Sequence, residues 1–577
     1  MRFTHSLLIG LATGITTFSY CQNIQTNQVG FFPKSTKKVT IVNPQENDKL
    51  LIINKSTNRV VSELNIPNST TYEHSGELVS TVELPQLVQP GQYNIELKKG
   101  KQQTTVIVSQ HWLTPLTKAT IKSFYYQRAS IELPEAYAGK WKRTAGHSDD
   151  QVYVHSSAAT TSRPEGFIIS SPRGWYDAGD YNKYIVNSGI SCYSILAAYE
   201  DFGAYFDTIQ VNIPESQNDI PDVLDELLWN LRWMLTMQDE DGGVYHKLTH
   251  ANFSGFVMPE QATKKRYVVK KSTAATLDFA AVLAQSSRVF QAFETQLPGF
   301  SDSCLNAAIK AYDWAEENPN ILYQQKSMNA EFNPAIKTGE YGDGKVDDEF
   351  FWATCELYIT TRDKKYVKKT YLESSQFDVP GWPSVGTLGL MSLYRHLDIS
   401  SKGYPKYLIK EKLLGLIEKT YQLPADNPYQ TVMGTKKNDF HWGSNSIAGN
   451  QAMVLFMGYQ LTKSKKYLEA CIGNLDYILG RNATGFCFVT GFGNKSPMHV
   501  HHRQSGSDTI LEPVPGLLAG GPGRDALNDC GVDTYNTTFP ALSYTDSQCS
   551  YSTNEIAINW QAPLLYLSAA IDQHYNK

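Results

Sequence analysis

The sequence has no excess of basic residues, since 52 Lys and Arg stand against 57 Asp and Glu and the formal net charge is -5. This balance argues against nucleic acid or an anionic membrane surface as a partner. Beyond the first 18 residues, no apolar run reaches the roughly 18 residues that a transmembrane helix needs. We therefore expect no transmembrane segment and no nucleic-acid partner.

The eight cysteines form no CxxC motif and show no regular spacing. Neither a zinc ribbon nor a disulfide-stapled small fold is indicated. Cys355, in the apolar stretch FFWATCELY, is expected to be a buried thiol. Cys530 and Cys549 lie in turn-rich sequence and are the candidates for a disulfide after export.

Aromatic residues are abundant, with 34 Tyr, 24 Phe and 10 Trp in 577 residues. Most of these rings must lie in the hydrophobic core, but aromatic side chains also suit stacking against the faces of sugars. The composition of 41% hydrophobic and 19% charged residues is that of an ordinary globular protein. The length predicts two or more domains.

The first 21 residues are predicted to be a signal peptide. Arg2 supplies a positive charge, and residues 7–18 are apolar but too short to span a bilayer. Cys21 is an alternative site for a lipid anchor. The protein is therefore expected to be exported, either secreted or periplasmic, with lipid anchoring at Cys21 as the alternative.

The pattern of the chain changes near residue 110. Residues 22–109 contain short β-branched runs separated by Asn, Gly, Pro and Lys, which predicts an immunoglobulin-like β-sandwich. Residues 112–577 show helical periodicity, for example in IPDVLDELLWNLRWMLTMQ. Long loops rich in Gly, Pro and aromatics interrupt the helices at 140–180 and 482–553. Many helices with functional loops at one end suggest an α/α toroid.

Two carboxylates stand three positions apart in GWYDAGDYNKYIVNSG, with glycines and aromatic rings on both sides. Asp180 is well placed to be the N-cap of a helix through YIVNSGISCYSILAAYE. The alternative is that Asp177 and Asp180 act together on a small molecule. Spacing alone does not separate capping from catalysis.

A second acidic motif lies in YTDSQCSYSTNEIAINWQAPLLYL, where Thr553 and Asn554 can start a helix. Glu555 is then expected in the first turn of that helix, a position that the helix dipole also favours without any catalysis. Upstream, the loop TGFGNKSPMHVHHRQSG carries His501 and Arg503. The accompanying arginine and the lack of HxxxH spacing argue against a metal there and favour hydrogen bonding to a polyol.

Together, WYDAGDYNKY, GFGNKSPMHVHHR and YTDSQCSYSTNEIAINWQAP resemble glycoside hydrolase family 9, the inverting β-1,4-glucanases. The stretch IQTNQVGFFP is similar to the immunoglobulin-like domain that precedes many members. The likeness extends over essentially the whole chain after the signal. It implies a β-sandwich at 22–109 followed by an (α/α)₆ barrel catalytic domain at 112–577.

The resemblance also implies roles for individual residues. Asp180 matches the general base, Asp177 the partner that helps to hold the attacking water, and Glu555 the general acid. His501 and Arg503 match residues that contact sugar beside the cleavage point. Inversion needs one ionised and one protonated carboxyl about 6.5–9.5 Å apart on opposite faces of the sugar.

Four further positions follow from the same likeness. Asp546 matches an acidic residue that orients its neighbours. Trp560 matches an aromatic position that lines the cleft. Trp442 in HWGSNS and His246 in DGGVYHK resemble further substrate-binding residues of the cleft.

The resemblance bears on metals as well. YGDGKVDDEFFWA resembles the family's calcium loop, with Asp348 and Glu349 as possible ligands, although a solvated helix N-terminus is the alternative. The zinc site of many relatives is not expected, because Ala129 and the pair Gly146-His147 replace its cysteines. No cofactor is expected to be required for catalysis.

The expected function is that of an exported, monomeric, inverting endo-β-1,4-glucanase whose partner is a β-1,4-glucan polysaccharide or oligosaccharide. One alternative is an exo-acting member, a cellobiosidase, glucosidase or glucosaminidase, or an enzyme for a branched glucan such as xyloglucan. The other is a carbohydrate-binding protein without catalysis. The presence of Asp177, Asp180 and Glu555 together argues against the last.

Overall fold

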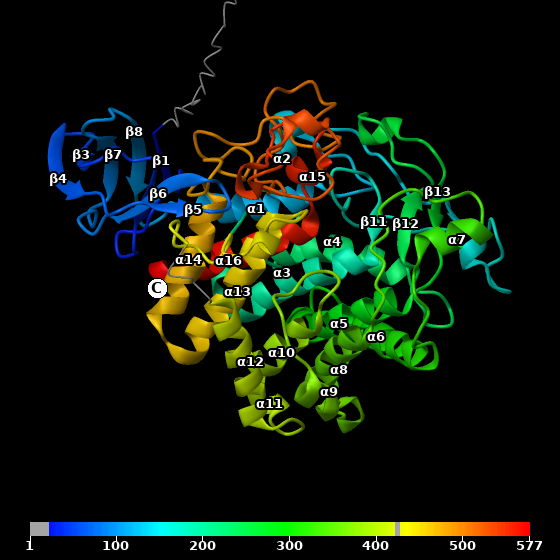
Figure 1. Ribbon diagram of the computed structural model, residues 1–577. Helices are drawn as coiled ribbons and strands as arrows, with labels where there is room; N and C mark the ends of the chain where they lie inside the picture. The colour runs from blue at the N-terminus through cyan, green and yellow to red at the C-terminus, as the bar shows by residue number, and fades with distance from the viewer. Residues whose placement is uncertain (1–21, 422–426) are drawn as a thin grey trace, which may run out of the picture.

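A computed structural model describes residues 22–421 and 427–577 of the chain (Figure 1). The predicted signal peptide and Cys21 lie outside the described residues. Strands form the N-terminal part, and helices dominate from residue 114 onwards. Among the helices described, none combines the length and the apolar character needed to cross a bilayer.

The N-terminal part is a sandwich of two four-stranded sheets, ordered β1-β2-β6-β5 and β4-β3-β7-β8. Apolar side chains alternate along the strands, and those that face inward, such as Ile41, Ile52 and Ile95, are fully buried between the sheets. The strands are β1 (Asn23–Thr26), β2 (Lys38–Val42), β3 (Lys49–Asn54), β4 (Arg59–Asn65), β5 (Thr70–Tyr72), β6 (Glu77–Glu83), β7 (Gly91–Leu97) and β8 (Gln103–Val108).

The remaining chain is mainly helical. The longer helices are α1 (Thr114–Tyr126), α3 (Ile185–Phe206), α4 (Asp222–Thr236), α5 (Thr273–Phe290), α6 (Phe300–Glu317), α8 (Asp347–Thr361), α10 (Gly386–Arg395), α12 (Lys406–Thr420), α13 (Ser444–Thr462), α14 (Lys465–Ile478) and α16 (Ile558–Asn576). Short helices are α2 (Glu135–Ala138), α7 (Gln325–Glu331), α9 (Lys369–Ser374), α11 (Leu397–Ser400) and α15 (Tyr551–Asn554).

The helices pack around one another in a closed sequence of contacts. Helix α3 packs on α5, α5 on α8, α8 on α10, and α10 reaches α13 through α12. The C-terminal helix α16 closes the circuit, because it packs on both α13 and α3 (Figure 1). One large apolar core therefore runs through this domain and leaves its long loops free to form a site.

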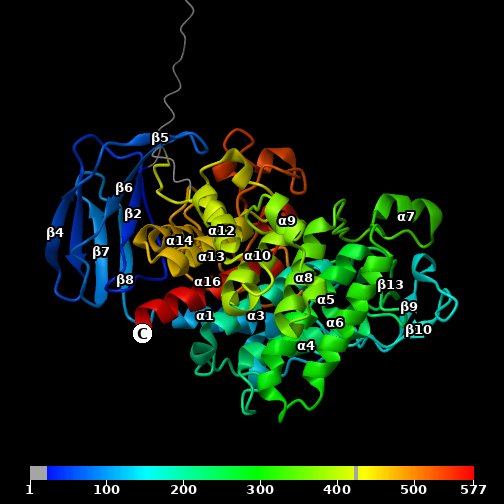
Figure 2. The same cartoon turned by 90° about the horizontal axis from the view of Figure 1, so that it is seen from below.

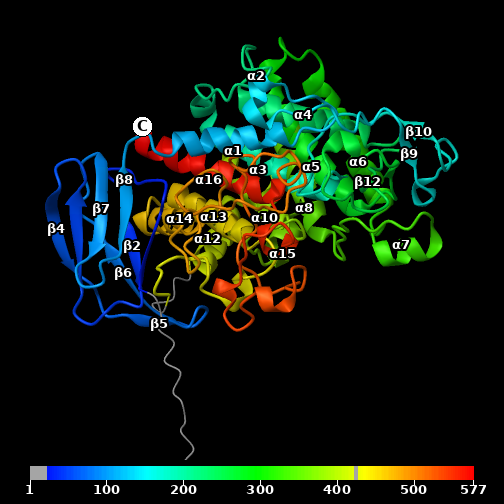
Figure 3. The same cartoon turned by 90° about the horizontal axis from the view of Figure 1, so that it is seen from above.

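A small five-stranded sheet, ordered β10-β9-β13-β12-β11, lies at the far end from the sandwich (Figures 2 and 3). Its strands are β9 (Val152–Val154), β10 (Ile168–Ile169), β11 (Lys183–Tyr184), β12 (Lys247–His250) and β13 (Arg266–Val268). Strand β11 follows Asp180 directly and pairs with β12, which fixes the chain just after the paired aspartates.

The sandwich packs against the helical domain beside α14 (Figures 2 and 3). Asn27 donates from Nδ2 to Oδ1 of Asp476 at 2.9 Å, and both side chains are buried. Tyr72 donates from its hydroxyl to the carbonyl of Gly434 at 2.8 Å. These buried polar contacts fix the orientation of the two parts, since each would cost free energy if left unpaired.

Cysteine placement agrees with the sequence-based expectation. Cys530 and Cys549 form a disulfide, and Cys355 is a buried free thiol. The disulfide joins two parts of the long loop region that precedes α16.

Candidate active site

The paired aspartates and the C-terminal acidic motif meet through their backbones. The amide of Ile558 donates to the carbonyl of Asp177 at 2.9 Å, and the amide of Arg503 donates to the carbonyl of Gly179 at 3.0 Å. Three loops that are far apart in the sequence are therefore joined by main-chain hydrogen bonds. This arrangement fixes their side chains relative to one another.

Gly179 is required by this close approach. A Cβ atom at this position would lie 2.0 Å from the carbonyl oxygen of His501, well inside van der Waals contact. Gly174, at the start of the same stretch, has a φ of 82°, which favours glycine. The glycines around the paired aspartates thus allow the close backbone approach and the positive φ that this stretch requires.

The structure shows whether Asp180 caps a helix or belongs to the candidate active site. Helix α3 begins at Ile185, and its N-cap residue is Tyr184 in extended conformation with no side-chain cap hydrogen bond. Asp180 lies four residues before that N-cap and is 5% exposed. It does not cap the helix, and it faces a cleft instead.

The prediction that Glu555 lies in the first turn of a helix is wrong. Helix α15 ends at Asn554, α16 begins at Ile558, and Glu555 has φ -70° and ψ 162°, an extended conformation. The physical reason is backbone pairing on both sides. Ile556 pairs with Ala519 and Ala557 pairs with Ala178, which holds this segment extended between the two helices.

Hydrogen-bond donors converge on both aspartates. Asp177 accepts from Asn187 Nδ2 at 2.5 Å and from the Tyr341 hydroxyl at 2.7 Å. Asp180 accepts from the Asn182 amide and from the Tyr184 hydroxyl. Donors of this kind stabilise the ionised forms of the two carboxyls.

Burial opposes that stabilisation. Burial and the neighbouring charge of Asp180 raise the pKa of Asp177 to about 8. Burial also raises the pKa of Asp180, while Arg503, Asn182 and Tyr184 act to lower it. The two carboxyls titrate as a pair, and Asp180 is the member that we expect to hold the negative charge because the Arg503 guanidinium faces it.

Glu555 is in a different electrostatic state. Its side chain is only partly exposed, and burial followed by the charge of Asp180 raises its pKa well above the usual range. The opposing effects of Arg503 and of a hydrogen bond from the Gly179 amide are smaller than that of burial. Glu555 therefore keeps its proton near neutral pH, as a general acid must.

All three carboxyls line one cleft with a volume of about 1190 Å³. Aromatic side chains are frequent along its walls, and some are partly exposed, as sugar-stacking platforms are. Phe253 is 45% exposed and Trp442 is 42% exposed. Its aromatic lining residues include Phe253, Tyr341, Trp382, Trp442, Tyr551 and Trp560.

His501 and Arg503 both line the cleft. The Nδ1 atom of His501 lies 2.7 Å from the carbonyl of Gln548, and burial lowers the pKa of the ring to about 4. Arg503 donates to the carbonyls of Ser254 and Gly179 at 2.8 Å each. The site thus presents a neutral imidazole and a fixed cation beside the acids.

Trp442 and Trp560 line the cleft, and the Trp442 ring lies 5.3 Å from that of Tyr551. Asp546 does not line it. Its carboxylate accepts from the amides of Met498 and His499 at 2.8 and 2.9 Å, and Asn554 donates to it at 3.1 Å. Asp546 is therefore a positioning residue that joins the His501 loop to the segment before Glu555.

The expectation that His246 contacts substrate is wrong. His246 is buried, and its ring stacks on Tyr323 with 4.0 Å between centroids. Its Nδ1 lies 2.8 Å from Ser272 Oγ and its Nε2 lies 2.8 Å from the carbonyl of Glu340. With both nitrogens engaged inside the protein, the side chain holds the 340 loop in place.

Sequence reasoning missed Tyr341, which lines the cleft and donates to Asp177. Its backbone has a φ of 45°, unusual for a residue with a side chain. The signal that was present is its position before Gly342 and Asp343, a turn sequence inside the stretch already singled out for calcium. Asn187 was missed because it lies inside helix α3.

The stretch with Asp348 and Glu349 forms part of a buried acidic cluster. Both carboxylate oxygens of Glu349 and of Asp278 are buried with no hydrogen-bond donor. Asp348 Oδ2 accepts a hydrogen bond from the amide of Val385 at 2.7 Å. No three His, Cys, Asp or Glu side chains in residues 22–421 and 427–577 are arranged to hold a metal ion. The calcium site stays a prediction.

Models of known protein families match both the N-terminal part and the helical part of the chain. The model of "Glycosyl hydrolase family 9" matches residues 114–568, and that of "Cellulase N-terminal ig-like domain" matches residues 19–102. A xyloglucan-specific endo-β-1,4-glucanase of Bacteroides ovatus is 43% identical over 98% of this chain and 97% of its own length.

Two more similarities are consistent with these. Endoglucanase D of Acetivibrio thermocellus is 30% identical over 96% of this chain and 84% of its own length. A solved structure described as Bacteroides ovatus GH9 superposes with a TM-score of 0.89 at 42% identity, covering 96% of this chain and 99% of that one.

Proposed function

Because the chain belongs to glycosyl hydrolase family 9 and is a glycosidase that acts on O-glycosyl bonds in β-1,4-glucans, we propose that its cleft cleaves internal bonds with inversion. The observation that carries the proposal is the meeting of Asp177, Asp180 and Glu555 in one cleft. The raised pKa of Glu555 favours its protonated form, and the charge of Arg503 lowers the pKa of Asp180 against the effect of burial.

Asp180 is the general base in this proposal. Its carboxylate takes a proton from a water molecule as that water attacks the anomeric carbon from the face opposite the leaving group. Asp177 holds the same water and adjusts the charge of its neighbour. The donors Asn187 and Tyr341 keep Asp177 fixed while it does so.

Glu555 is the general acid. Its proton passes to the glycosidic oxygen as the bond to the anomeric carbon breaks, so that the departing chain leaves as a neutral alcohol. Burial maintains that proton at neutral pH. Net proton movement is then from water through Asp180 to solvent, and from solvent back to Glu555, with no organic cofactor required.

The substrate that we propose is a β-1,4-glucan main chain that carries branches, xyloglucan being the type named for the relative from Bacteroides ovatus. The cleft volume of about 1190 Å³ exceeds the range of about 300–1,000 Å³ typical of small-molecule pockets and suits several consecutive sugar units. Trp442, Trp560 and Phe253 are the rings on which those units would stack. His501 and Arg503 are the polar contacts beside the cleaved bond.

Several finer features remain part of the proposal. The closed circuit of helices is consistent with an (α/α)₆ barrel in which α3, α5, α8, α10, α13 and α16 are the inner helices. Export, with or without lipid at Cys21, and a monomeric state are likewise proposed. Calcium at Asp348 and Glu349 is likewise proposed, and it would take part in no chemical step.

Product analysis tests the main proposal. Chromatography of early products from a panel of soluble glucans should show a spread of internal fragments, with branched glucan cleaved best. NMR of the first-formed reducing ends should show the inverted α anomer. Release of a single small sugar from chain ends would show an exo-acting enzyme, and a β anomer would refute inversion.

A further inference from the structure

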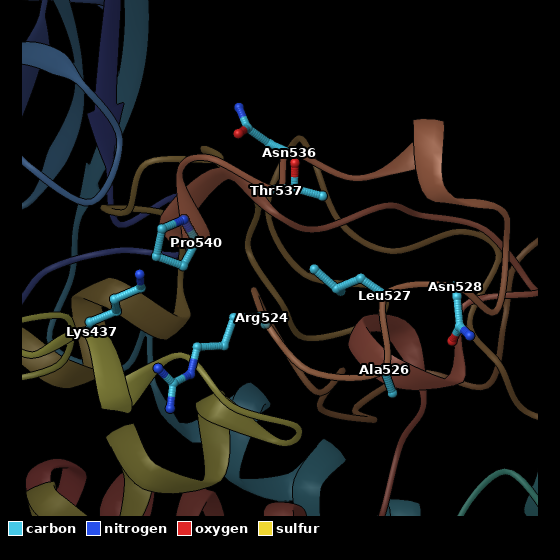
Figure 4. Close-up of a pocket in the computed structure, with 9 residues that line it drawn as sticks. Lys437, Arg524, Ala526, Leu527, Asn528, Asn536, Thr537 and Pro540 are labelled. Carbon is cyan, nitrogen blue, oxygen red and sulfur yellow. The ribbon is translucent and has the colours of Figure 1, made fainter.

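A second pocket, here named the side pocket, opens next to the cleft with a volume of about 410 Å³. Its polar lining residues are Lys437, Arg524, Asn528, Asn536 and Thr537, and its apolar ones include Leu527 and Pro540. Figure 4 shows Lys437 and Arg524 on one side and Asn528 on the other, with the Leu527 side chain reaching between them. Nothing in the proposed mechanism uses these residues.

The side pocket borders the catalytic cleft directly. Ala526 lines both spaces. The short helix η6 (Lys437–Asp439) separates them, because Lys437 lines the side pocket and Asp439 lines the cleft. A polymer lying in the cleft therefore passes the mouth of the side pocket.

The wall of the side pocket starts at the catalytic acid. The amide of Gly520 donates to the carbonyl of Glu555, and the amide of Gly521 donates to that of Thr553, both at 2.9 Å. The chain then continues from Gly520 to Ala526, six residues that span at most about 20 Å. The side pocket is thus within a few sugar units of the bond that is cleaved.

The lining chemistry suits a neutral sugar. Amide and cationic side chains donate hydrogen bonds to hydroxyl groups, and Leu527 and Pro540 offer apolar contact for the CH face of a ring. No carboxylate lines the pocket among the residues described. Its volume lies in the range of small-ligand sites and is about one third of that of the cleft, which fits one branch and excludes a main chain.

The pocket loop is fixed before any ligand binds. The disulfide between Cys530 and Cys549 ties it to the segment that leads to Glu555. Asp529 accepts from the amide of Ser552 at 2.8 Å and from the Tyr535 hydroxyl. Such pre-organisation lowers the entropy cost of binding.

The β-sandwich holds the other end of this loop. The amide of Ala541 donates to the carbonyl of His74 at 3.1 Å. The ring of Phe539 packs over Gly76, where an added Cβ would lie 2.4 Å from the ring. The N-terminal domain therefore contacts the loop that forms the side pocket and not the catalytic residues themselves.

From these observations we propose that the side pocket binds a monosaccharide branch of a β-1,4-glucan whose main chain lies in the cleft. The proposal rests on the proposed function, which supplies the main chain. Arg524 and Lys437 bind the hydroxyls of the branch, and Leu527 contacts its ring. The pocket is therefore a specificity determinant for branched over unbranched glucan.

The test compares two oligosaccharides of equal main-chain length, one carrying α-linked xylosyl branches and one without. Arg524→Ala and the double variant with Lys437→Ala should lose roughly ten- to a hundredfold in kcat/KM on the branched substrate, the value of hydrogen bonds to a charged group. The loss on the unbranched substrate should be less than about threefold, as no contact to the main chain is removed.

Leu527→Trp is the second variant, because it fills the pocket without changing its charge. It should give the same selective loss. Lys410→Ala, which removes an exposed charge on α12 outside both pockets, is the matched control and should change neither rate. Equal losses on both substrates, or none on either, would overturn the proposal.

A binding measurement separates this proposal from the proposed function. Calorimetry of the Glu555→Gln protein with both oligosaccharides should show that Arg524→Ala weakens binding of the branched one alone. If the wild-type enzyme cleaves unbranched glucan and shows no preference for the branched one, the side-pocket proposal fails. Its function as a β-1,4-glucanase would still stand. If it neither binds nor cleaves any β-1,4-glucan, the function itself fails.

Discussion

Replacing Glu555 by glutamine removes the proposed acid with almost no change of shape. The raised pKa of the partly buried wild-type side chain keeps it protonated near neutrality, so a neutral amide of the same size reproduces its charge state. We therefore expect the fold to be retained. Loss of general acid catalysis should slow hydrolysis of natural glucans by about 10²- to 10⁴-fold, equivalent to roughly 3–5 kcal/mol in the barrier.

The assay compares two leaving groups. Glycosides with a nitrophenyl leaving group need little protonation and should lose far less activity than an unactivated oligosaccharide. Equal loss on both substrates, with an unchanged melting temperature, would contradict the assignment of Glu555 as the acid.

A stability measurement gives an independent check. The folded-state pKa of Glu555 is raised above the unfolded value of about 4.5. Its contribution to stability is therefore complete below that value and is lost as the pH rises through the folded pKa. Glutamine does not titrate, so the variant should match the wild type near pH 4 and be more stable than it at about pH 8. A variant less stable than the wild type at about pH 8 would refute the buried, protonated state.

Three further predictions concern the paired aspartates and the domain contact. Asp180→Asn should lose about 10²- to 10⁴-fold in kcat, and added azide should restore part of that activity. Azide should restore less activity to Asp177→Asn. If azide rescued only Asp177→Asn, Asp177 would be the base and Asp180 its partner. Tyr341→Phe removes a donor that lowers the pKa of Asp177, so the higher of the two apparent pKa values of the Asp177–Asp180 pair should rise in an NMR titration, and a fall would contradict this. Asn27→Ala removes one donor of the buried Asp476, whose other carboxylate oxygen lies 3.5 Å from Arg481 Nε, and should lower the free energy of unfolding by about 1–3 kcal/mol in urea titrations; no change would mean that the contact is dispensable.

Much of the fold was predictable where one face of an element is buried. In α4 the apolar residues recur at helical spacing, and the sandwich strands alternate, so sequence periodicity identified both. Helix α10 is harder to predict from periodicity, since all of Gly386–Leu393 is buried. Helix α1 is hard to predict for a related reason, because Thr117, Thr120 and Ser123 are buried beside its apolar residues.

The site was predictable through local motifs and less so through contacts between them. Asp177, Asp180 and Glu555 stand in distinctive stretches, and the structure brings them to one cleft. The hydrogen bond from Tyr341 joins residues 164 positions apart, which no local pattern reveals. The extended conformation of Glu555 likewise depends on pairing with Ala519 and Ala178, which lie outside its own motif.

The distance along the chain between the two halves of the site has a consequence for synthesis. Glu555 follows Asp180 by 375 residues (555 − 180). At about 5–20 residues per second, a ribosome needs roughly 20–75 s to make this stretch. A nascent chain that already holds both aspartates therefore lacks the proposed acid, and under the proposed mechanism it cannot hydrolyse glucan. Because α16 also closes the circuit of helices, the final part of the domain to be made both completes the core and starts the chemistry.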